Sequence, residues 1–428
     1  MLSPHIIAKD LLSEHLTAES QSLSFAHVMI DFPTMSFSRR AWLRGSLVAG
    51  ATVVSGLHRL AAQAPATVPP PGESGRQGGE RLADILFIHE PTLELDVSQG
   101  AGLDGRLYTD LSTLFPEHAV VPTTKFYVRT RASELLDATK PWFIALKPQA
   151  HAARADALTI PDLKKQSRPV GLHLMECSGN GRATKFGLLS VADWAGVPFA
   201  DILDRMKAPP GSRILVSGFD RYPQSSSTSV EGASWIFTAE QLRSAKAFLA
   251  LEMNGEPLTR DHGAPVRLLV PGWYGCTCIK WVNEISPIAA DSSPTSQMLE
   301  FAARTHQDGT PKLARDFRPA LIQQAAMPIR VEKWLAGGNI KYRVVGILWG
   351  GTQPVQALQI RFNPEEDYVD VDQPSPASSN SLWSFWFHVW TPKTPGTYSI
   401  RLRVKEPAIR SIRLDAGFYV RSVEITEV

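Results

Sequence analysis

The sequence predicts an α+β domain followed by a β-sandwich of immunoglobulin type, and three observations favour this architecture. From about residue 82 to 325, short apolar runs typical of strands alternate with helical stretches, without the regular rhythm of a βαβ fold. From about residue 326 to 428, β-rich runs follow one another and turn residues separate them. The chain has 428 residues, 43% hydrophobic and 20% charged, which is ordinary for a soluble protein of two or three domains.

Residues 1–64 are expected to comprise an N-terminal extension and a twin-arginine export signal. The paired Arg39 and Arg40 precede a mild apolar run over 47–57 and an A-x-A cleavage site that ends at Ala64. This order is typical of an export signal, and the apolar run is too short to span a bilayer. The pattern therefore predicts an exported, periplasmic protein.

The remaining elements follow in chain order. A start at Met35 is expected, and the Pro/Gly-rich residues 65–81 read as a linker. In the first domain we expect strands over 143–146, 170–176, 213–217 and 266–270, and helices over 193–206 and 239–249. In the second domain we expect strands over 340–349, 355–362, 382–390 and 397–404.

Charge and cysteine content exclude several function classes. The formal net charge is +2 and no run of 18 apolar residues occurs outside the leader, so neither nucleic acid nor a stable membrane span is expected. The three cysteines are Cys177, Cys276 and Cys278, so at least one thiol stays outside disulfides. A C-x-C disulfide is uncommon on geometric grounds, and we expect the last two to be buried thiols.

The densest chemical motif surrounds Cys177. It reads His173-Leu-Met-Glu-Cys177-Ser-Gly-Asn-Gly-Arg182, and the cysteine is expected at the end of a strand, before a glycine-rich turn. Three interpretations compete: a buried structural thiol, a nucleophile with His173 as its base, and a ligand for a soft metal. His173 lies four residues back on the same strand, too far for a direct hydrogen bond without a bend.

Several separated blocks resemble the sulfite oxidase family. Residues 176–182 resemble its Cys-(Ala/Ser)-Gly-Asn segment, and residues 187–198 and 252–285 resemble its downstream motifs. Residues 346–351, with the tryptophans near residue 386, resemble its C-terminal dimerisation domain. The resemblance favours the metal ligand. It implies a molybdopterin-binding catalytic domain over 82–325 and an immunoglobulin-like dimerisation domain over 326–428.

The resemblance also implies roles for individual residues. Cys177 would bind the molybdenum of a molybdenum–molybdopterin cofactor. The other residues implied in cofactor binding are Arg129, Asp220, His262, Arg267, Cys278, Ile279 and Lys280, of which His262, Arg267 and Lys280 would face the phosphate. Arg129 and Arg182 would bind the anionic substrate beside the metal.

Three departures from the family pattern concern the substrate. Arg131 stands where the family usually has a histidine, and the loop after Arg182 lacks a tryptophan found in the family. Arg304 or His306 stands where an active-site tyrosine is expected. Arg131 would take over a cofactor contact or be exposed, and His306 would serve the site or lie on a helix surface.

The function expected from the resemblance is oxidation of sulfite to sulfate by oxo transfer. Electrons would pass to an external c-type cytochrome, and the C-terminal domain would form a homodimer. Three alternatives stay open: another oxo-transfer reaction, such as reduction of a sulfoxide or an oxyanion; a cysteine hydrolase; and a non-catalytic pterin-binding dimer.

Overall fold

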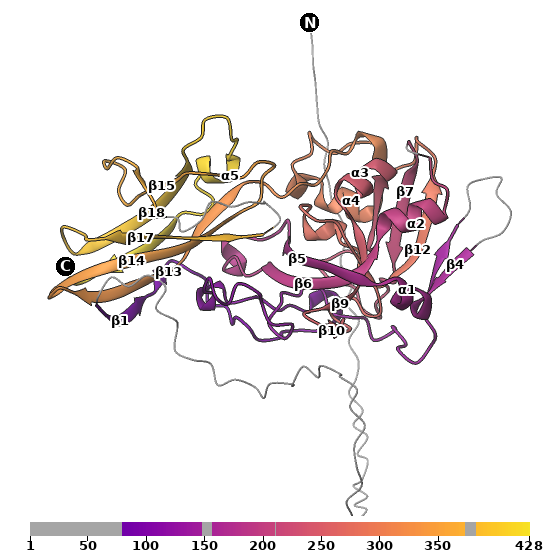
Figure 1. Cartoon of the computed structure of the whole chain (residues 1–428), viewed down its shortest axis with the longest axis horizontal. Coiled ribbons are helices and arrows are strands. Elements are labelled where there is room, and N and C mark those ends of the chain that lie inside the picture. The colour runs from indigo at the N-terminus through magenta and orange to yellow at the C-terminus, as the bar shows by residue number, and fades with distance from the viewer. Residues whose placement is uncertain (1–78, 148–155, 210, 373–381) are drawn as a thin grey trace, which may run out of the picture. The chain divides into compact units, whose positions relative to one another are not determined.

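The computed structural model describes residues 79–147, 156–209, 211–372 and 382–428, all within one unit, Val68–Val428 (Figure 1). The predicted export signal, the candidate start at Met35 and nearly all of the predicted linker lie outside the described residues. In the described part strands far exceed helices, and they form four sheets.

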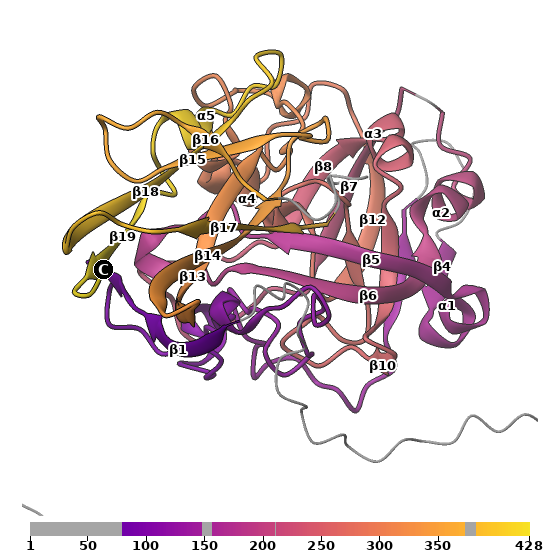
Figure 2. The ribbon, with the colours of Figure 1, turned by 60° about the vertical axis from the view of Figure 1, so that its left-hand side comes forward.

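The sheet that carries the cysteine motif is built around two long strands, β5 and β6, which run side by side in Figure 2. Its order is β10-β9-β6-β5, with β11 added to β9. The strands are β5 (Arg168–Glu176), β6 (Leu189–Pro198), β9 (Phe248–Met253), β10 (Glu256–Pro257) and β11 (Arg267–Leu269). All pairings are antiparallel. Cys177 therefore follows directly after the last residue of β5.

A second five-stranded sheet supports the opposite wall of the cleft described below. Its order is β4-β3-β12-β7-β8, and only the β3–β12 pairing is parallel. The strands are β3 (Phe143–Leu146), β4 (Asp156–Thr159), β7 (Arg213–Gly218), β8 (Ser234–Thr238) and β12 (Val282–Ile288).

Short helices connect these strands. They are α1 (Ile160–Gln166), α2 (Phe199–Arg205), α3 (Ala239–Ser244) and α4 (Ser296–Phe301), with 3-10 turns at Gly102–Asp104, Leu111–Thr113, Arg182–Thr184, Gly275–Thr277, Ala303–Thr305 and Ala314–Asp316. Side-chain capping explains where α3 begins: the Thr238 hydroxyl accepts from the Gln241 amide, and the Gln241 side chain accepts from the Thr238 amide.

Two of the predicted helices are longer than the helices in the structure, because part of each predicted segment forms a strand. Residues 193–206 begin as the end of strand β6 and become helical only at Phe199, and residues 239–249 leave α3 to enter β9. Strand β6 lies between β5 and β9 and is buried along most of its length. A strand buried on both faces lacks polar alternation, so its apolar pattern resembles that of a buried helix.

The C-terminal region contains two sheets. The first has the order β1-β13-β14-β17, with β1 (Glu80–Ile85), β13 (Ala325–Ala336), β14 (Asn339–Trp349) and β17 (Ser384–Trp390). The second has the order β16-β15-β18-β19-β2, with β2 (Phe87–Ile88), β15 (Leu358–Arg361), β16 (Val369–Asp370), β18 (Gly396–Val404) and β19 (Arg421–Ile425). The short helix α5 (Ile412–Asp415) precedes β19. The predicted strands of this region are present.

Aromatic side chains pack between these two sheets. The Trp390 ring of β17 stacks on Phe362 at 3.9 Å and meets Tyr398 of β18 edge-on at 4.6 Å. Trp386 is fully buried and Trp383 nearly so, which assigns these two tryptophans to the core. The two sheets thus share an apolar interior, whereas the immunoglobulin-like topology stays a prediction.

The N-terminal strands belong to the C-terminal sheets, which departs from the predicted domain boundary. Indigo β1 lies alongside orange β13 in Figure 2, and β2 pairs with β19. Residues 80–88 thus pair with the sheets of the predicted 326–428 domain. Among the described residues, no helix is both long and apolar enough to cross a membrane.

Candidate active site

Eight of the nine predicted site residues line one cleft. Its walls come from the end of β5, the segment around Arg129 and the loops that flank β7 and β11. The eight are Arg129, Cys177, Asp220, His262, Arg267, Cys278, Ile279 and Lys280. A cleft in which a thiol and several polar side chains converge is a candidate ligand site.

Cys177 is a buried thiol whose position is fixed by backbone hydrogen bonds. It is 4% exposed, its amide donates to the Leu188 carbonyl at 2.9 Å, and its carbonyl accepts from the Asn180 amide at 2.9 Å. The Gly179 amide donates to the sulfur at 3.4 Å. Burial raises the pKa of the Cys177 thiol, and the Gly179 amide and the charge of Arg129 oppose that rise. A bound cation would favour the thiolate.

His173 does not form a nucleophile–base pair with Cys177. It is absent from the cleft lining, and its ring packs 5.6 Å from Phe248. Its Nδ1 atom has no hydrogen-bond partner among the described residues, and burial lowers the pKa of the ring. The arrangement therefore gives no support to a cysteine hydrolase.

Buried Arg267 and half-buried Lys280 both line the cleft, and no carboxylate of the described residues forms an ion pair with either. Among the described residues, Arg267 donates only to the carbonyls of His262 and Cys278, both at 3.1 Å, and its Nε has no partner. The Lys280 ammonium donates to the carbonyls of Thr130 and Asp261. Burial, helped by the nearby Arg267 charge, lowers the pKa of Lys280 to about 7. Such a site lacks an anion in close contact and is prepared to accept one.

The other predicted cofactor contacts also line the cleft. One carboxylate oxygen of Asp220 accepts from the amides of Gly232 and Ala233 at 2.8 and 2.9 Å, which orients its side chain. The Cys278 sulfur accepts from the Val270 amide at 3.4 Å, and the Ile279 carbonyl accepts from Leu268 at 2.8 Å. The 276–280 segment is thus held beside the cleft by β11.

The phosphate-binding role predicted for His262 stays a prediction, and in this structure both of its ring nitrogens have protein partners. Its Nε2 lies 3.0 Å from the Phe126 carbonyl and its Nδ1 lies 2.7 Å from the Thr259 hydroxyl, so both ring nitrogens have protein partners. Burial lowers the pKa of His262 to about 4, although the Phe126 carbonyl opposes this shift. His262 is therefore neutral at pH 7 and joins two walls of the cleft.

The substrate-binding role predicted for Arg182 also stays a prediction, and in this structure its guanidinium has partners outside the cleft. Arg182 does not line the cleft; it donates to the Val420 carbonyl and lies 3.6 Å from a Glu90 carboxylate oxygen. These partners come from the C-terminal region and from the segment after β2. They hold the guanidinium away from Cys177.

The three residues left open by the sequence have different surroundings. Arg131 pairs with Asp261 at 2.8 Å, so it braces the loop that carries His262. Arg304 is exposed and lies beside the cysteine turn: a Cβ added to Gly179 would lie 3.8 Å from both Arg304 Nη1 and Cys177 Sγ. His306 is also exposed, with its ring 6.1 Å from that of Tyr274.

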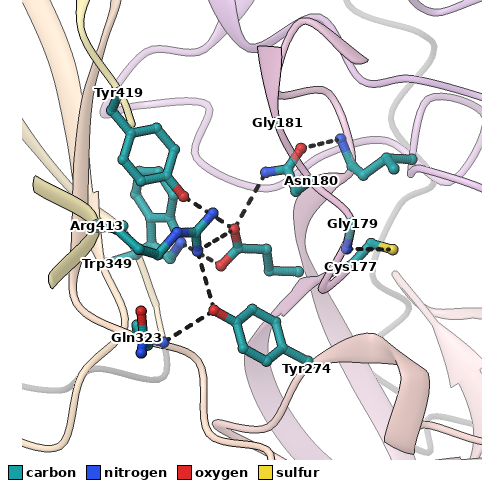
Figure 3. Close-up of polar contacts among 12 residues, drawn as sticks. Cys177, Gly179, Asn180, Gly181, Tyr274, Gln323, Trp349, Arg413 and Tyr419 are labelled. Carbon is teal, nitrogen blue, oxygen red and sulfur yellow. Dashed lines mark hydrogen bonds and ion pairs between the residues drawn. The ribbon is translucent and has the colours of Figure 1, made fainter. Parts of the chain in front are cut away.

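Glu176 is the site residue that sequence reasoning missed. It directly precedes Cys177 and is 0% exposed. One carboxylate oxygen accepts from Arg413 at 2.9 Å, Tyr419 at 3.3 Å and Asn180 at 3.4 Å, and the other accepts from Trp349 at 2.9 Å. Figure 3 shows Trp349, Arg413 and Tyr419 gathered beside the turn that carries Cys177. The signal that the sequence offered was the position of this acidic residue, directly before the candidate metal ligand Cys177.

Comparisons with known proteins agree with this site. Residues 137–296 match the oxidoreductase molybdopterin binding domain. The mitochondrial sulfite oxidase of Rattus norvegicus is 32% identical over 231 residues, which cover 46% of this chain and 41% of that protein. The sulfite oxidase of Arabidopsis thaliana is 27% identical over 281 residues, covering 59% of this chain and 70% of that protein. The chain spans about two fifths of the length of the mitochondrial sulfite oxidases that it matches.

A solved structure resembles most of the chain. The sulfane dehydrogenase SoxCD of Paracoccus pantotrophus superposes with a TM-score of 0.56 at 14% sequence identity. The match covers 84% of this chain and 96% of that one. At this identity the likeness concerns the fold alone.

Proposed function

Because this chain is a molybdopterin oxidoreductase of the sulfite oxidase family, we propose that it oxidises sulfite to sulfate at a molybdenum centre held by Cys177. The cofactor, when bound, supplies the oxygen-atom transfer and takes up two electrons. The observation that carries the proposal is one buried thiol at the base of a cleft in which no carboxylate of the described residues pairs with Arg267 or Lys280.

The residues of the cleft fit a molybdopterin group. A soft thiolate ligand at Cys177 suits a metal that already has sulfur ligands. The partnerless Nε of Arg267 and the ammonium of Lys280 offer donors to a phosphate, which needs fixed positive groups. The Asp220 carboxylate lines the cleft and would accept from pterin N–H groups. Each of these donors and acceptors would otherwise be buried at a cost.

Substrate binding falls to Arg129 and Arg304 in this proposal. Arg129 donates to Ser229 Oγ at 2.7 Å and to the Thr228 carbonyl at 2.9 Å, which fixes its guanidinium at the cleft wall. Neither arginine forms an ion pair with a carboxylate within the part of the chain that the structure describes. Both charges act on the Cys177 thiol and lower its pKa against the effect of burial. Two arginines beside the metal would hold the oxygens of sulfite with charge-assisted hydrogen bonds.

The cellular setting extends the proposal. The signal pattern in residues 36–64 supports export to the periplasm by the twin-arginine route, where a separate c-type cytochrome would accept the electrons. The C-terminal sheets would form a homodimer interface as the dimerisation domain. Fractionation of cells that make the full chain, and the mass of the purified protein in solution, test these two statements.

The decisive experiment adds sulfite to the molybdenum-loaded protein in the presence of oxidised cytochrome c. The proposal expects cytochrome reduction that depends on sulfite and is abolished in Cys177→Ser. Fully loaded wild-type protein that reduces neither cytochrome c nor an artificial electron acceptor with sulfite would overturn it.

A second oxo-transfer reaction gains support from the position of Arg182. Because Arg182 contacts Val420 and Glu90, the second substrate arginine would be Arg304, which differs from the residue that the family pattern implies. Reduction of a sulfoxide or an oxyanion at the same centre is the alternative. A substrate panel with a reduced viologen as electron donor would separate the two: turnover of a sulfoxide without turnover of sulfite favours the alternative.

A further inference from the structure

The Tyr127 hydroxyl is a polar group in the cleft that has no partner. Tyr127 is 7% exposed and lines the cleft, yet no hydrogen bond to its hydroxyl occurs among the described residues. A tyrosine hydroxyl donates one hydrogen bond, and here no protein group receives it. Where such a donor faces a binding cleft, a bound ligand is a natural acceptor.

Several contacts fix where this hydroxyl lies. The Tyr127 amide donates to Ser190 Oγ at 3.1 Å, and the neighbouring Val128 pairs with Leu107 in an isolated bridge. A Cβ built on Gly275 would lie 2.5 Å from the Tyr127 hydroxyl oxygen and 3.3 Å from the Glu176 carbonyl oxygen. The hydroxyl is therefore seated against Gly275, next to the peptide group that leads into Cys177.

The chemistry of the hydroxyl limits what it does there. Burial, and after it the proximity of Cys177, raise the pKa of Tyr127 well above its ordinary value, so the phenol stays protonated and acts as a donor. It makes no hydrogen bond to the Cys177 sulfur, which accepts from the Gly179 amide instead. A group bound in the cleft offers the acceptor that the protein does not supply. The ligand atoms of a thiolate-bound metal are electron-rich and accept such bonds.

We propose that Tyr127 donates a hydrogen bond to an anionic ligand atom of the molybdenum cofactor beside Cys177 and thereby tunes the reduction potential of the metal. A donor to a metal ligand withdraws electron density and makes the reduced metal easier to form. The inference rests on the cofactor at Cys177 and is independent of whether sulfite is the substrate.

The test compares the molybdenum-loaded Tyr127→Phe protein with the wild type. Phenylalanine keeps the ring and removes only the hydroxyl. We expect the reduction potential of the metal to be more negative in Tyr127→Phe than in the wild type. In the wild type, the paramagnetic state of the metal should show coupling to a proton that is present in water and lost in deuterium oxide. We expect this coupling to be absent from Tyr127→Phe. Tyr222→Phe is the matched control, because the Tyr222 hydroxyl already donates to the Arg131 carbonyl at 3.1 Å and lies outside the cleft lining. The control should keep the wild-type potential.

A second variant, at Gly275, should displace the Tyr127 hydroxyl without changing Tyr127 itself. Gly275→Ala places a methyl group 2.5 Å from the hydroxyl oxygen and should displace the phenol, with a shift of potential in the same direction as Tyr127→Phe. In the double variant the two shifts should not add, because the contact is already lost.

Two outcomes decide the proposal. Loss of molybdenum from Tyr127→Phe but not from Tyr222→Phe would support a contact with the cofactor. A loaded Tyr127→Phe protein with the wild-type potential and the wild-type proton coupling would overturn it. A chemical reductant drives the titration, so a protein that fails to oxidise sulfite still gives a clear answer.

Discussion

Replacing Glu176 with glutamine should destabilise the protein strongly, because this carboxylate joins the cysteine strand to the C-terminal region. Glu176 lies 0% exposed and accepts four hydrogen bonds, one of them from the largely buried Arg413. Although burial acts in the opposite direction, the Glu176 carboxylate raises the pKa of Arg413. Glutamine keeps the shape but removes the charge. It leaves the Arg413 guanidinium without a counter-ion and turns one amide N–H group toward donors.

Breaking a buried ion pair by removing one partner costs about 3–5 kcal/mol. We expect Glu176→Gln to lower the free energy of unfolding by about this amount, measured by urea denaturation with tryptophan fluorescence and far-UV circular dichroism. The slope of the unfolding free energy against urea concentration should stay unchanged, because the variant exposes the same surface area on unfolding. Trp349 donates to Glu176 at 2.9 Å and should report the loss in its fluorescence.

Two controls separate this effect from a general loss of charge. Asp204→Asn breaks an exposed pair with Arg243 and should cost at most about 1 kcal/mol. Combining Glu176→Gln with Arg413→Gln removes both buried charges and should recover part of the stability. A single Glu176→Gln variant that loses less than about 1 kcal/mol would refute the reasoning, since a solvated pair behaves in that way.

Two further predictions concern the cations of the cleft. In cofactor-free protein, the pKa of Lys280 is about 7 when folded and returns to its ordinary value on unfolding, so the unfolded chain binds more protons between these values. Relative to Lys280→Met, the wild type should therefore become more stable as pH rises from 7 toward about 10 in paired urea titrations, and parallel curves would contradict this. Arg304→Gln should raise the KM for sulfite roughly tenfold to hundredfold, since a charge-assisted hydrogen bond contributes about 1.5–3 kcal/mol. Arg182→Gln should leave that KM within about threefold, because its guanidinium contacts Glu90 and Val420 instead.

The sequence predicted the cleft better than the sheets around it. Cys177 follows a strand as expected, and the residues around Arg267 and Lys280 lie beside it. The positions of these residues depend on nearby segments of the chain. The end of β5 determines where Cys177 lies, and β11 with the turn after it determines where Arg267 and Lys280 lie. The strands of the C-terminal region could be read for the same reason, from runs of β-branched and aromatic residues.

The features that sequence reasoning missed depend on contacts between distant parts of the chain. The direction of Arg182 is set by Val420 and Glu90, which local spacing cannot reveal. Strand β1 pairs with β13, which lies about 250 residues later in the chain. Such a pairing depends on how the whole sheet assembles, and local sequence does not reveal it. Residues 193–198, the second half of strand β6, were taken for the start of a helix, because the strand is buried along most of its length. The role of Glu176 needs donors supplied from residues 349, 413 and 419.

The central claim is that the sulfur of Cys177 binds molybdenum, and X-ray absorption at the molybdenum edge tests it most directly. The spectra of the loaded wild type and of Cys177→Ser should differ by one sulfur neighbour of the metal. Cys276→Ser, which alters another buried thiol of the cleft, should match the wild type. A Cys177→Ser protein that keeps its molybdenum with an unchanged sulfur shell would contradict the assignment.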